Sequence, residues 1–335
     1  MSELKVALMS SVSLRRNIEG RPFVNKMGSV EKQDTKYYLN QIITHNIATY
    51  ANLRYIDAYD LTETEKYALV EKQLVEEDFL NSQDMALWVN EDFDFAIIIN
   101  YEDHLRIHCN TEGLSVFDAY QTVLYYDEIL QDFLNYAFDE RYGYLTASTK
   151  NAGTGLCVKT TLHIPMLVFS EKIKAIEEIV SKRNLMVAGR YGKNSVSYAN
   201  TFQLSSLYAI GYKEEEMLEI VHNATEEIIN AEVLKRNEAI YEDNLLVVDA
   251  VNRSYGLLKY SRLIGSQEAS KRLSFVRMGI EMGIITNVDI KLIINLIQTV
   301  PLATFALLKG TVVNDKNIDR MRADLIREEL SRINY

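Results

Sequence analysis

The 335-residue chain is poor in cysteine, proline and histidine, with two, three and five of these residues respectively. Two cysteines are too few for a disulfide framework or a thiolate-rich zinc site, and the histidines show no metal-binding spacing, so we expect no metal centre. No apolar run reaches the roughly 18 residues that a membrane-spanning helix needs, and the N-terminal segment is too short and too charged for a signal peptide. These absences predict a cytoplasmic protein that does not bind membranes.

Positive charge is also in deficit. The chain has 36 Lys and Arg residues against 47 Asp and Glu residues, and its formal net charge is −11. This balance argues against general binding to nucleic acids. Apolar residues make up 47% of the chain and charged residues 25%, as in ordinary globular proteins. A typical length of about 150 residues per domain suggests two domains.

Hydrophobic spacing divides the chain near residue 243. Strand-like runs are expected over 4–9, 86–89, 93–99, 105–109, 158–164, 185–187 and 201–208, and helices over 33–52, 61–82, 115–137 and 170–183. Three of these strands follow one another without a helix, which implies antiparallel pairing. After residue 213 only helical spacing remains, including 245–262, 266–283, 287–298 and 316–332. We predict an α+β domain with an antiparallel sheet over 1–243 and an all-helical domain over 244–335.

Two short segments carry groups suited to chemistry, although the chain has no P-loop, dinucleotide fingerprint or HExxH motif. Residues 102–106 (Glu-Asp-His-Leu-Arg) directly follow an apolar strand, which is typical of an active site or of a solvated turn. Residues 153–155 (Gly-Thr-Gly) fit a flexible loop or a cradle for phosphate. The pattern alone leaves these alternatives open.

Longer sequence motifs help to decide between these alternatives. Residues 100–107 (NYEDHLRI) resemble the NEEDHLRI signature of the ATP:guanidino phosphotransferases, which include phosphagen kinases and bacterial protein-arginine kinases. Other segments follow in the family's order: 10–17 resembles its SSRxRxxRN opening with one residue missing, 143–156 its GYLTxCPTNxGTGL loop, and 191–205 its YGE…FQIS segment. The resemblance implies a sheet flanked by helices. It also implies transfer of the γ-phosphoryl group of MgATP to a guanidinium nitrogen.

The C-terminal third resembles the protein-arginine kinase branch. Residues 253–260 (RSYGLLKY) and 274–284 (SFVRMGIEMGI) are similar to its helical domain, which phosphagen kinases lack and which often dimerises. Residues 318–323 align with the branch's phosphoarginine-binding RDxxRA motif, where Asp319 and Arg322 match but Ile318 replaces the first arginine. The resemblance thus implies a phosphoarginine site at Asp319 and Arg322. The alternative is a basic terminal helix that carries only solvated charge.

Phosphoryl transfer depends on cations around the polyphosphate and on carboxylates that align the guanidinium. The resemblance assigns Glu102 to the guanidinium and Arg106 to the phosphates. It also assigns the nucleotide loop to Asn151, Gly153 and Gly155. These are the family residues that the sequence retains.

The expected losses are larger. Position by position, Val12 and Leu14 replace two arginines, Cys157 and Ala188 two more, Lys193 a glutamate, Ser148 a reactive cysteine, and Gln73 a histidine that lies against the adenine. Arg15 and Arg16 are candidate replacements for the two arginines lost at Val12 and Leu14. A lysine in place of a carboxylate repels a guanidinium instead of aligning it. We therefore expect phosphotransfer to be weak or absent.

The leading hypothesis is a pseudokinase with a regulatory or protein-binding role. Its partners would be proteins that carry arginine or phosphoarginine, or an active paralogue, in a homodimer or heterodimer. The alternative is a divergent, active protein-arginine kinase that uses MgATP. Its replacement cations would be Lys150, Lys159, Arg190 and Lys193, in the loops that lost arginines. A kinase for a small guanidino metabolite is the third hypothesis.

Overall fold

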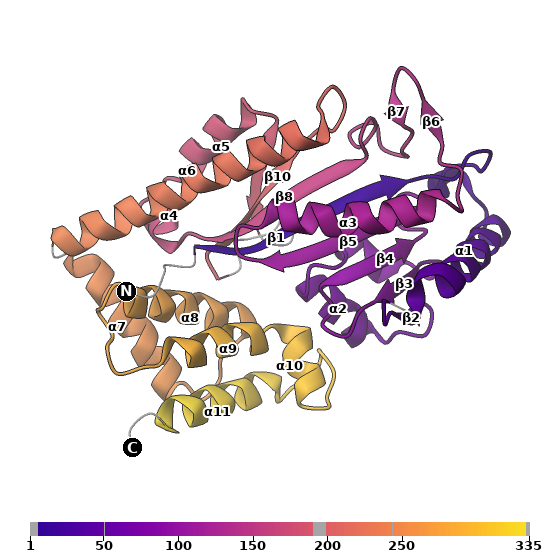
Figure 1. Ribbon diagram of the computed structural model, residues 1–335. Coiled ribbons are helices and arrows are strands. Elements are labelled where there is room, and N and C mark those ends of the chain that lie inside the picture. Colours follow the sequence, from indigo (N-terminus) through magenta and orange to yellow (C-terminus); the bar gives the residue numbers. More distant parts are fainter. Residues whose placement is uncertain (1–5, 50, 190–198, 243, 333–335) are drawn as a thin grey trace.

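The computed structural model describes residues 6–49, 51–189, 199–242 and 244–332. An antiparallel sheet with helices against it is followed by a group of C-terminal helices (Figure 1), which confirms the predicted fold class. The strands are β1 (Ala7–Arg16), β2 (Arg54–Asp57), β3 (Ala86–Val89), β4 (Phe95–Ile99), β5 (Leu105–Glu112), β6 (Phe138–Asp139), β7 (Gly143–Tyr144), β8 (Leu156–His163), β9 (Leu185–Gly189) and β10 (Thr201–Ser206).

The α-helices of the first part are α1 (Ser29–Ile43), α2 (Glu63–Glu71), α3 (Val116–Gln131), α4 (Pro165–Phe169), α5 (Ile173–Ser181) and α6 (Glu214–Tyr241). Short turns of other helix types are η1 (Val24–Lys26), η2 (Thr44–Ala48) and η3 (Glu77–Asn81). The C-terminal helices are α7 (Leu245–Tyr260), α8 (Ser266–Glu281), α9 (Ile290–Thr299), α10 (Leu302–Leu308) and α11 (Ile318–Ser331). The expected boundary, residue 243, lies outside the described residues, and the division into two domains stays a prediction.

The eight-stranded sheet has the order β2-β3-β4-β5-β1-β8-β10-β9, and every pair is antiparallel. Its central strand β1 starts at Ala7, later than predicted. The strand is also longer than predicted, because it continues through the segment 10–16. In this segment Val12 and Leu14 are fully buried, while Ser11 and Ser13 alternate with them and lie on the opposite face. The 4–9 prediction was therefore wrong in its bounds.

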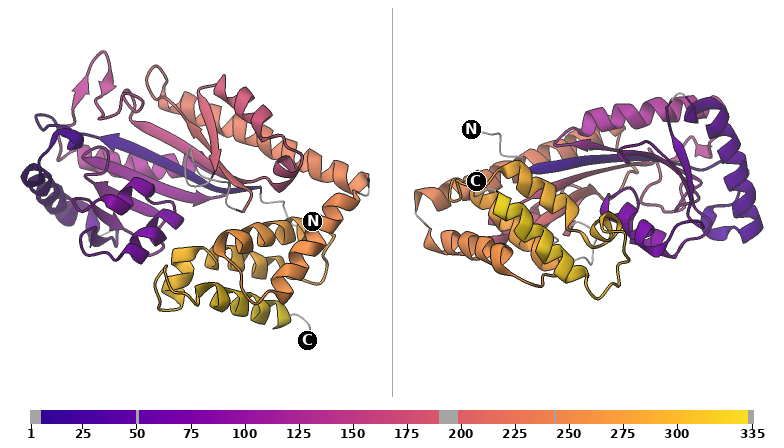
Figure 2. Two further views of the ribbon diagram at one scale, coloured as in Figure 1. Left: turned by 180° about the vertical axis from the view of Figure 1, so that it is seen from behind. Right: turned by 90° about the horizontal axis from the view of Figure 1, so that it is seen from below.

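The two faces of the sheet are covered differently. On one face, apolar side chains of α1, α3, α5 and α6 form the main core with alternate residues of the strands. On the other face, the segment that contains α2 and η3 packs on β3 and β4, with Leu74 and Phe79 fully buried. Figure 2 shows α3 and α2 on opposite sides of the sheet. The second face is therefore apolar only toward the β2 edge, and its centre is left to polar residues.

The helix predicted over 61–82 ends much earlier, at Glu71. Gln73 has a positive φ of 61°, and hydrogen bonds from Gln73 N to Val70 O (2.9 Å) and from Leu74 N to Leu69 O (3.2 Å) close a Schellman motif. A glycine normally marks this kind of helix end in a sequence. Because Gln73 occupies the position here, the sequence pattern did not indicate where the helix ends. The helix predicted over 170–183 is α5 (Ile173–Ser181). Sequence patterning missed the short helix α4 before it, which Glu171, at a positive φ of 54°, separates from α5.

Polar contacts join the C-terminal helices to the end of β8 and to the end of α2. The imidazole of His163, at the end of β8, lies 2.7 Å from the Ser274 hydroxyl of α8. The Glu71 carboxylate of α2 accepts hydrogen bonds from Ala303 N and Thr304 N at the start of α10, a helix that sequence patterning missed. No single helix in the described ranges has the length and hydropathy of a membrane span. Only the bent pair α9 and α10, at 94° to each other, passes such a test together.

Candidate functional site

Strand alternation gathers polar side chains over the centre of the sheet, on the face opposite to the main core. The cross-strand partners there are Arg15 with Arg106, Ser13 with His108 and with Cys157, and Ser11 with Asn110 and with Lys159. We call this surface of β1, β5, β8 and β10 the polar face. Two cations predicted for phosphate binding, Arg106 and Lys159, thereby come to one place.

A cavity of about 110 Å³ opens on the polar face. Arg106, Lys159 and His108 lie on its floor, and Gln73 and Glu76 line it from the segment that follows α2. The remaining lining residues are Ser11, Val70, Val75, Met186, Ala188, Gln203 and Ser205. The cavity combines basic, amide and hydroxyl groups, which suit an anionic ligand.

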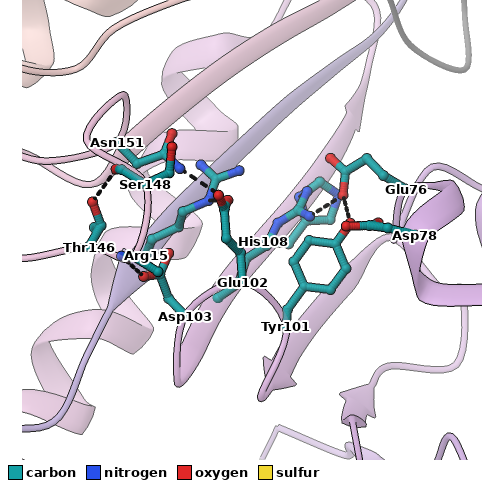
Figure 3. A network of polar contacts seen from close by, with 12 residues as sticks. Arg15, Glu76, Asp78, Tyr101, Glu102, Asp103, His108, Thr146, Ser148 and Asn151 are labelled. Atoms are coloured by element: carbon teal, nitrogen blue, oxygen red, sulfur yellow. Dashed lines mark hydrogen bonds and ion pairs between the residues drawn. The ribbon is translucent and has the colours of Figure 1, made fainter. Parts of the chain in front are cut away.

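The carboxylate of Glu76 occupies the basic end of this cavity. Its two oxygens accept hydrogen bonds from Arg106 Nη1 at 2.5 Å and from Lys159 Nζ at 2.7 Å, and both are also ion pairs. The Tyr101 hydroxyl lies 2.8 Å from a Glu76 oxygen and also bonds Asp78, as Figure 3 shows. One internal carboxylate therefore pairs with both cations that converge here.

Charge in the cavity is set by burial and by this ion pair. Burial opposes ionisation of Glu76, but Arg106 and Lys159 hold the pKa of its carboxyl well below the usual range. Because the folded pKa is lowered, the ion pair is complete at neutral pH and is lost only as the pH falls through that lowered pKa. Burial, reinforced by Arg106, lowers the pKa of His108 well below its usual value, so its imidazole is neutral.

A second polar group surrounds the retained carboxylate of Glu102, whose side chain is 41% exposed. Arg15 Nε lies 3.8 Å from Glu102, and the Asn151 amide donates a 3.2 Å hydrogen bond to it (Figure 3). Among the described residues, Arg15 Nε and Nη1 have no hydrogen-bond partner although both are buried. Arg15 thus lies on the polar face beside Glu102, and its role as a replacement cation stays a prediction. The predicted Ser148 lies beside Asn151, where its carbonyl accepts a hydrogen bond from the Thr146 hydroxyl at 2.7 Å.

The glycines of the predicted nucleotide loop have close backbone neighbours. Gly153 and Gly155 have positive φ values of 102° and 69°. A Cβ on Gly155 would lie 2.5 Å from the Arg15 carbonyl oxygen, and one on Gly143 would lie 2.4 Å from the Gly153 oxygen. These approaches explain the glycines by packing against β1 and within the loop.

Two residues of the NYEDHLRI motif hold neighbouring segments of the chain through hydrogen bonds. Asp103 accepts hydrogen bonds from the Asn17 amide at 2.7 Å and from Ala147 N at 2.7 Å. Nδ1 of His104 accepts from Ile18 N at 2.9 Å, which leaves its Nε2 as the donor to the Pro22 carbonyl at 2.8 Å. Burial lowers the pKa of His104, in agreement with this neutral form.

Several predicted cations do not reach the cavity. Arg16 points away from the polar face, pairs with Asp127 at 2.6 Å and stacks on the Tyr144 ring at 3.6 Å. Lys150 is exposed on its loop and is not among the lining residues. Arg190 and Lys193 lie outside the described residues, so their roles stay predictions.

The predicted phosphoarginine residues lie on α11, and Arg322 is fully buried. Its guanidinium donates to Val300 O at 3.1 Å, to Ile264 O at 2.9 Å and to Asp319 at 2.6 Å. Arg320, two residues after Ile318 on the same helix, is largely exposed and lies 3.9 Å from Asp324. Three of the contacts of Arg322 are thus internal, and phosphoarginine binding at this position stays a prediction.

Comparison with known proteins places this geometry in a family. Residues 35–235 match the model of the ATP:guanido phosphotransferase C-terminal catalytic domain, and residues 244–335 match that of the protein-arginine kinase McsB C-terminal domain. A protein-arginine kinase of Halothermothrix orenii is 33% identical over 331 residues, which are 98% of this chain and 94% of the relative. One of Desulforamulus reducens is 33% identical over 332 residues, 98% of this chain and 93% of the relative.

The chain belongs to the protein-arginine kinase family. Solved structures of guanidino kinases share its fold. The duplicated taurocyamine kinase from Schistosoma mansoni has a TM-score of 0.60 at 21% identity, over 68% of this chain and 33% of that chain. Lombricine kinase has a TM-score of 0.56 at 19% identity, over 71% of this chain and 67% of that chain.

The structure shows where β1 places the residues that were assigned to the lost arginines. Val12 and Leu14 were expected at the positions of two lost arginines, but both side chains lie fully buried in the main core. Ser11 and Ser13 are the residues that face Lys159 and His108 on the polar face. The single missing residue in the opening segment shifts the pattern by one, and in a strand this exchanges the two faces.

Members of this family use ATP with Mg²⁺, and the polar face does not fit a polyphosphate as it stands. Arg106 and Lys159 are already bound by Glu76, and Ser11 and Ser13 beside them carry no charge. Sequence reasoning missed Glu76. The sequence offered one indication of it: an acidic residue three positions after Gln73, in a segment that was considered for Gln73 alone.

Proposed function

We propose that this member of the protein-arginine kinase family is a pseudokinase that works by binding proteins. The observation that carries the proposal is the Glu76 carboxylate bound by Arg106 and Lys159. A γ-phosphoryl group in transfer needs cations that are free to stabilise its developing charge. Here the two converging cations have an internal partner, and a triphosphate would have to displace it at a cost in free energy.

Losses around the cavity support the same proposal. Charge-assisted hydrogen bonds contribute about 1.5–3 kcal/mol each, and every 1.4 kcal/mol is a factor of about ten in affinity or rate. On the polar face, Ser11 and Ser13 offer only neutral hydroxyls, and Cys157 and Ala188 stand where two further arginines are expected. These contributions are not additive, but together they disfavour a bound triphosphate by several orders of magnitude.

The test is an incubation with MgATP and an arginine-rich protein, read by mass spectrometry for phosphoarginine. We expect no phosphoarginine above the level of a control without ATP. An active bacterial protein-arginine kinase, run in parallel, checks that the substrate accepts the phosphoryl group. Phosphoarginine formed at the rate of that control would contradict the proposal.

The second candidate is a divergent active kinase, and one observation favours it. Glu102 is 41% exposed and forms a 3.8 Å ion pair with Arg15, whose nitrogens Nε and Nη1 have no hydrogen-bond partner within the described part of the chain. A carboxylate for a guanidinium and a cation for a phosphate are therefore still adjacent. In this alternative MgATP displaces Glu76, and the same assay detects phosphoarginine.

The partners we propose are arginine-bearing or phosphoarginine-bearing proteins and a second protein-arginine kinase chain. The corner between α6 and α7 suits such a pairing, because four large apolar side chains there are each more than half exposed: Ile240, Tyr241, Leu245 and Leu246. In Figure 1 this corner lies at the edge of the molecule, away from the sheet.

We expect a dimer by light scattering, and a monomer for the Leu245→Glu/Leu246→Glu variant, because two buried charges would oppose association. Leu308→Glu is the control, since Leu308 is also more than half exposed (59%) but lies on α10. A wild-type monomer, alone and with an active relative, would rule out this pairing.

A further inference from the structure

Residues 71–78, which we call the strap, connect the C-terminal helices to the polar face. The strap starts at Glu71, whose carboxylate binds the first turn of α10, and five residues later presents Glu76 to Arg106 and Lys159. Figure 1 shows α2 between the sheet and α10, in agreement with the contacts between the two helices. A segment of eight residues thus touches both parts of the chain.

At its first end, the strap is tied to α10 by side-chain and backbone groups. Glu71 accepts hydrogen bonds from Ala303 N at 2.9 Å, from Thr304 N at 2.7 Å and from the Thr304 hydroxyl at 2.8 Å. A carboxylate on the first N–H groups of a helix is a favourable, charge-assisted contact. The position of α10 therefore fixes the position of Glu71.

In its middle, the strap is held by Gln73. The left-handed backbone of Gln73, φ 61°, turns the chain from the end of α2 toward the sheet. Its side-chain oxygen accepts hydrogen bonds from the Thr161 hydroxyl at 3.0 Å and from the Gln203 amide at 2.7 Å. A non-glycine residue held in this conformation is strained, and its position depends on the surrounding contacts.

At its far end, the strap carries the carboxylate that pairs with the two cations. Glu76 binds Arg106 and Lys159, and Asp78 shares the Tyr101 hydroxyl with Glu76. The Glu76 side chain is 37% exposed, so it has a path away from the cavity. Leu74 and Phe79, which are fully buried, anchor the backbone around it.

We propose that the strap is an autoinhibitory latch: the contact of Glu71 with α10 holds Glu76 on Arg106 and Lys159, and movement of α10 releases it. This inference rests on the proposed role of Glu76. Released, the polar face becomes a site for an oxyanion such as a polyphosphate. Coupling between sites is reciprocal, so an anion bound at Arg106 and Lys159 also loosens the contact of Glu71 with α10.

The experiment measures binding of sodium tripolyphosphate by calorimetry in four proteins: wild type, Glu71→Ala, Glu76→Gln and the double variant. We expect Glu71→Ala to bind at least about fivefold more tightly than wild type, the lower end of typical coupling. The double variant is expected to match Glu76→Gln alone, because both changes act through the same carboxylate. Glu65→Ala, which removes the cap at the opposite end of α2, is the control for general loosening and is expected to bind like wild type.

Each outcome decides a different point. A gain in Glu76→Gln without a gain in Glu71→Ala overturns the latch and leaves the proposed function standing. Gains that add in the double variant also overturn it, since Glu71 would then act independently of Glu76. No gain in Glu76→Gln removes both the latch and the observation that carries the proposed function.

Hydrogen exchange provides an independent readout. If the latch is correct, tripolyphosphate speeds hydrogen exchange of the Ala303 and Thr304 amides in the wild-type protein, because the anion displaces Glu76 and loosens the strap. The same amides in Glu71→Ala protein exchange fast with or without the anion. Unchanged exchange in wild type at saturating tripolyphosphate contradicts the coupling.

Discussion

Replacing Glu76 by glutamine is expected to turn the polar face into an anion-binding site. The variant keeps the size of the side chain but removes the charge that Arg106 and Lys159 share. Because each charge-assisted hydrogen bond contributes about 1.5–3 kcal/mol, binding of tripolyphosphate should tighten by about ten- to a hundredfold. Calorimetry measures the affinity directly.

A thermal signature should accompany this gain. Without an anion, Glu76→Gln leaves the buried Arg106 guanidinium without its carboxylate, and the variant should melt below wild type. Added tripolyphosphate should restore the melting temperature, because a ligand that binds only the folded state stabilises it. Glu77→Gln is the matched control, since it removes one negative charge from the exposed neighbouring residue. Equal affinities in the two variants would show that Glu76 does not block the cations.

Replacing Arg322 by alanine is expected to cost about 3–5 kcal/mol of unfolding free energy. The substitution removes a fully buried guanidinium that binds the carbonyls of Val300 and Ile264 and the Asp319 carboxylate. Both carbonyls would lose a strong donor, and the space beside the Phe305 ring, 5.1 Å from the guanidinium carbon, would empty. Denaturant unfolding monitored by circular dichroism measures the loss.

Arg320→Ala is the matched control on the same helix. Arg320 is exposed and its contact with Asp324 spans 3.9 Å, so its loss should change stability by less than about 0.5 kcal/mol. If Arg322→Ala is as stable as Arg320→Ala, the buried contacts of Arg322 contribute nothing. The comparison also bears on ligand binding, because a loss of phosphoarginine affinity in Arg322→Ala is informative only when the helices remain folded.

The sequence predicted the class of the fold because its strands follow one another closely and its C-terminal third has helical spacing alone. It failed where the deciding feature was backbone geometry. Gln73 ends α2 in a left-handed conformation that usually requires glycine or asparagine, so the helix was extended to residue 82. The length of β1 was also missed, because a motif rich in serine and arginine conceals a central strand.

At the site, the sequence identified Arg106 and Lys159 but not what neutralises them. Glu76 lies 30 residues before Arg106 and 83 before Lys159, and no local spacing connects an acid with cations that distant. The alternation of β1 also decides which residues face the cavity, and one missing residue exchanged them. Contacts of this kind depend on register across strands, which a single sequence does not specify.

The long helix α6 has a consequence for how the chain unfolds. Its Glu232, fully buried, accepts hydrogen bonds from Met166 N and Leu167 N of α4 and pairs with Arg236, which also binds Glu281 of α8. Met166 itself packs among the apolar residues of the C-terminal helices. A domain assignment by sequence cuts this chain at one point, yet its interior charges are shared across that cut. Neither half can open without stranding a charge in the other, so the two parts should denature in a single cooperative step.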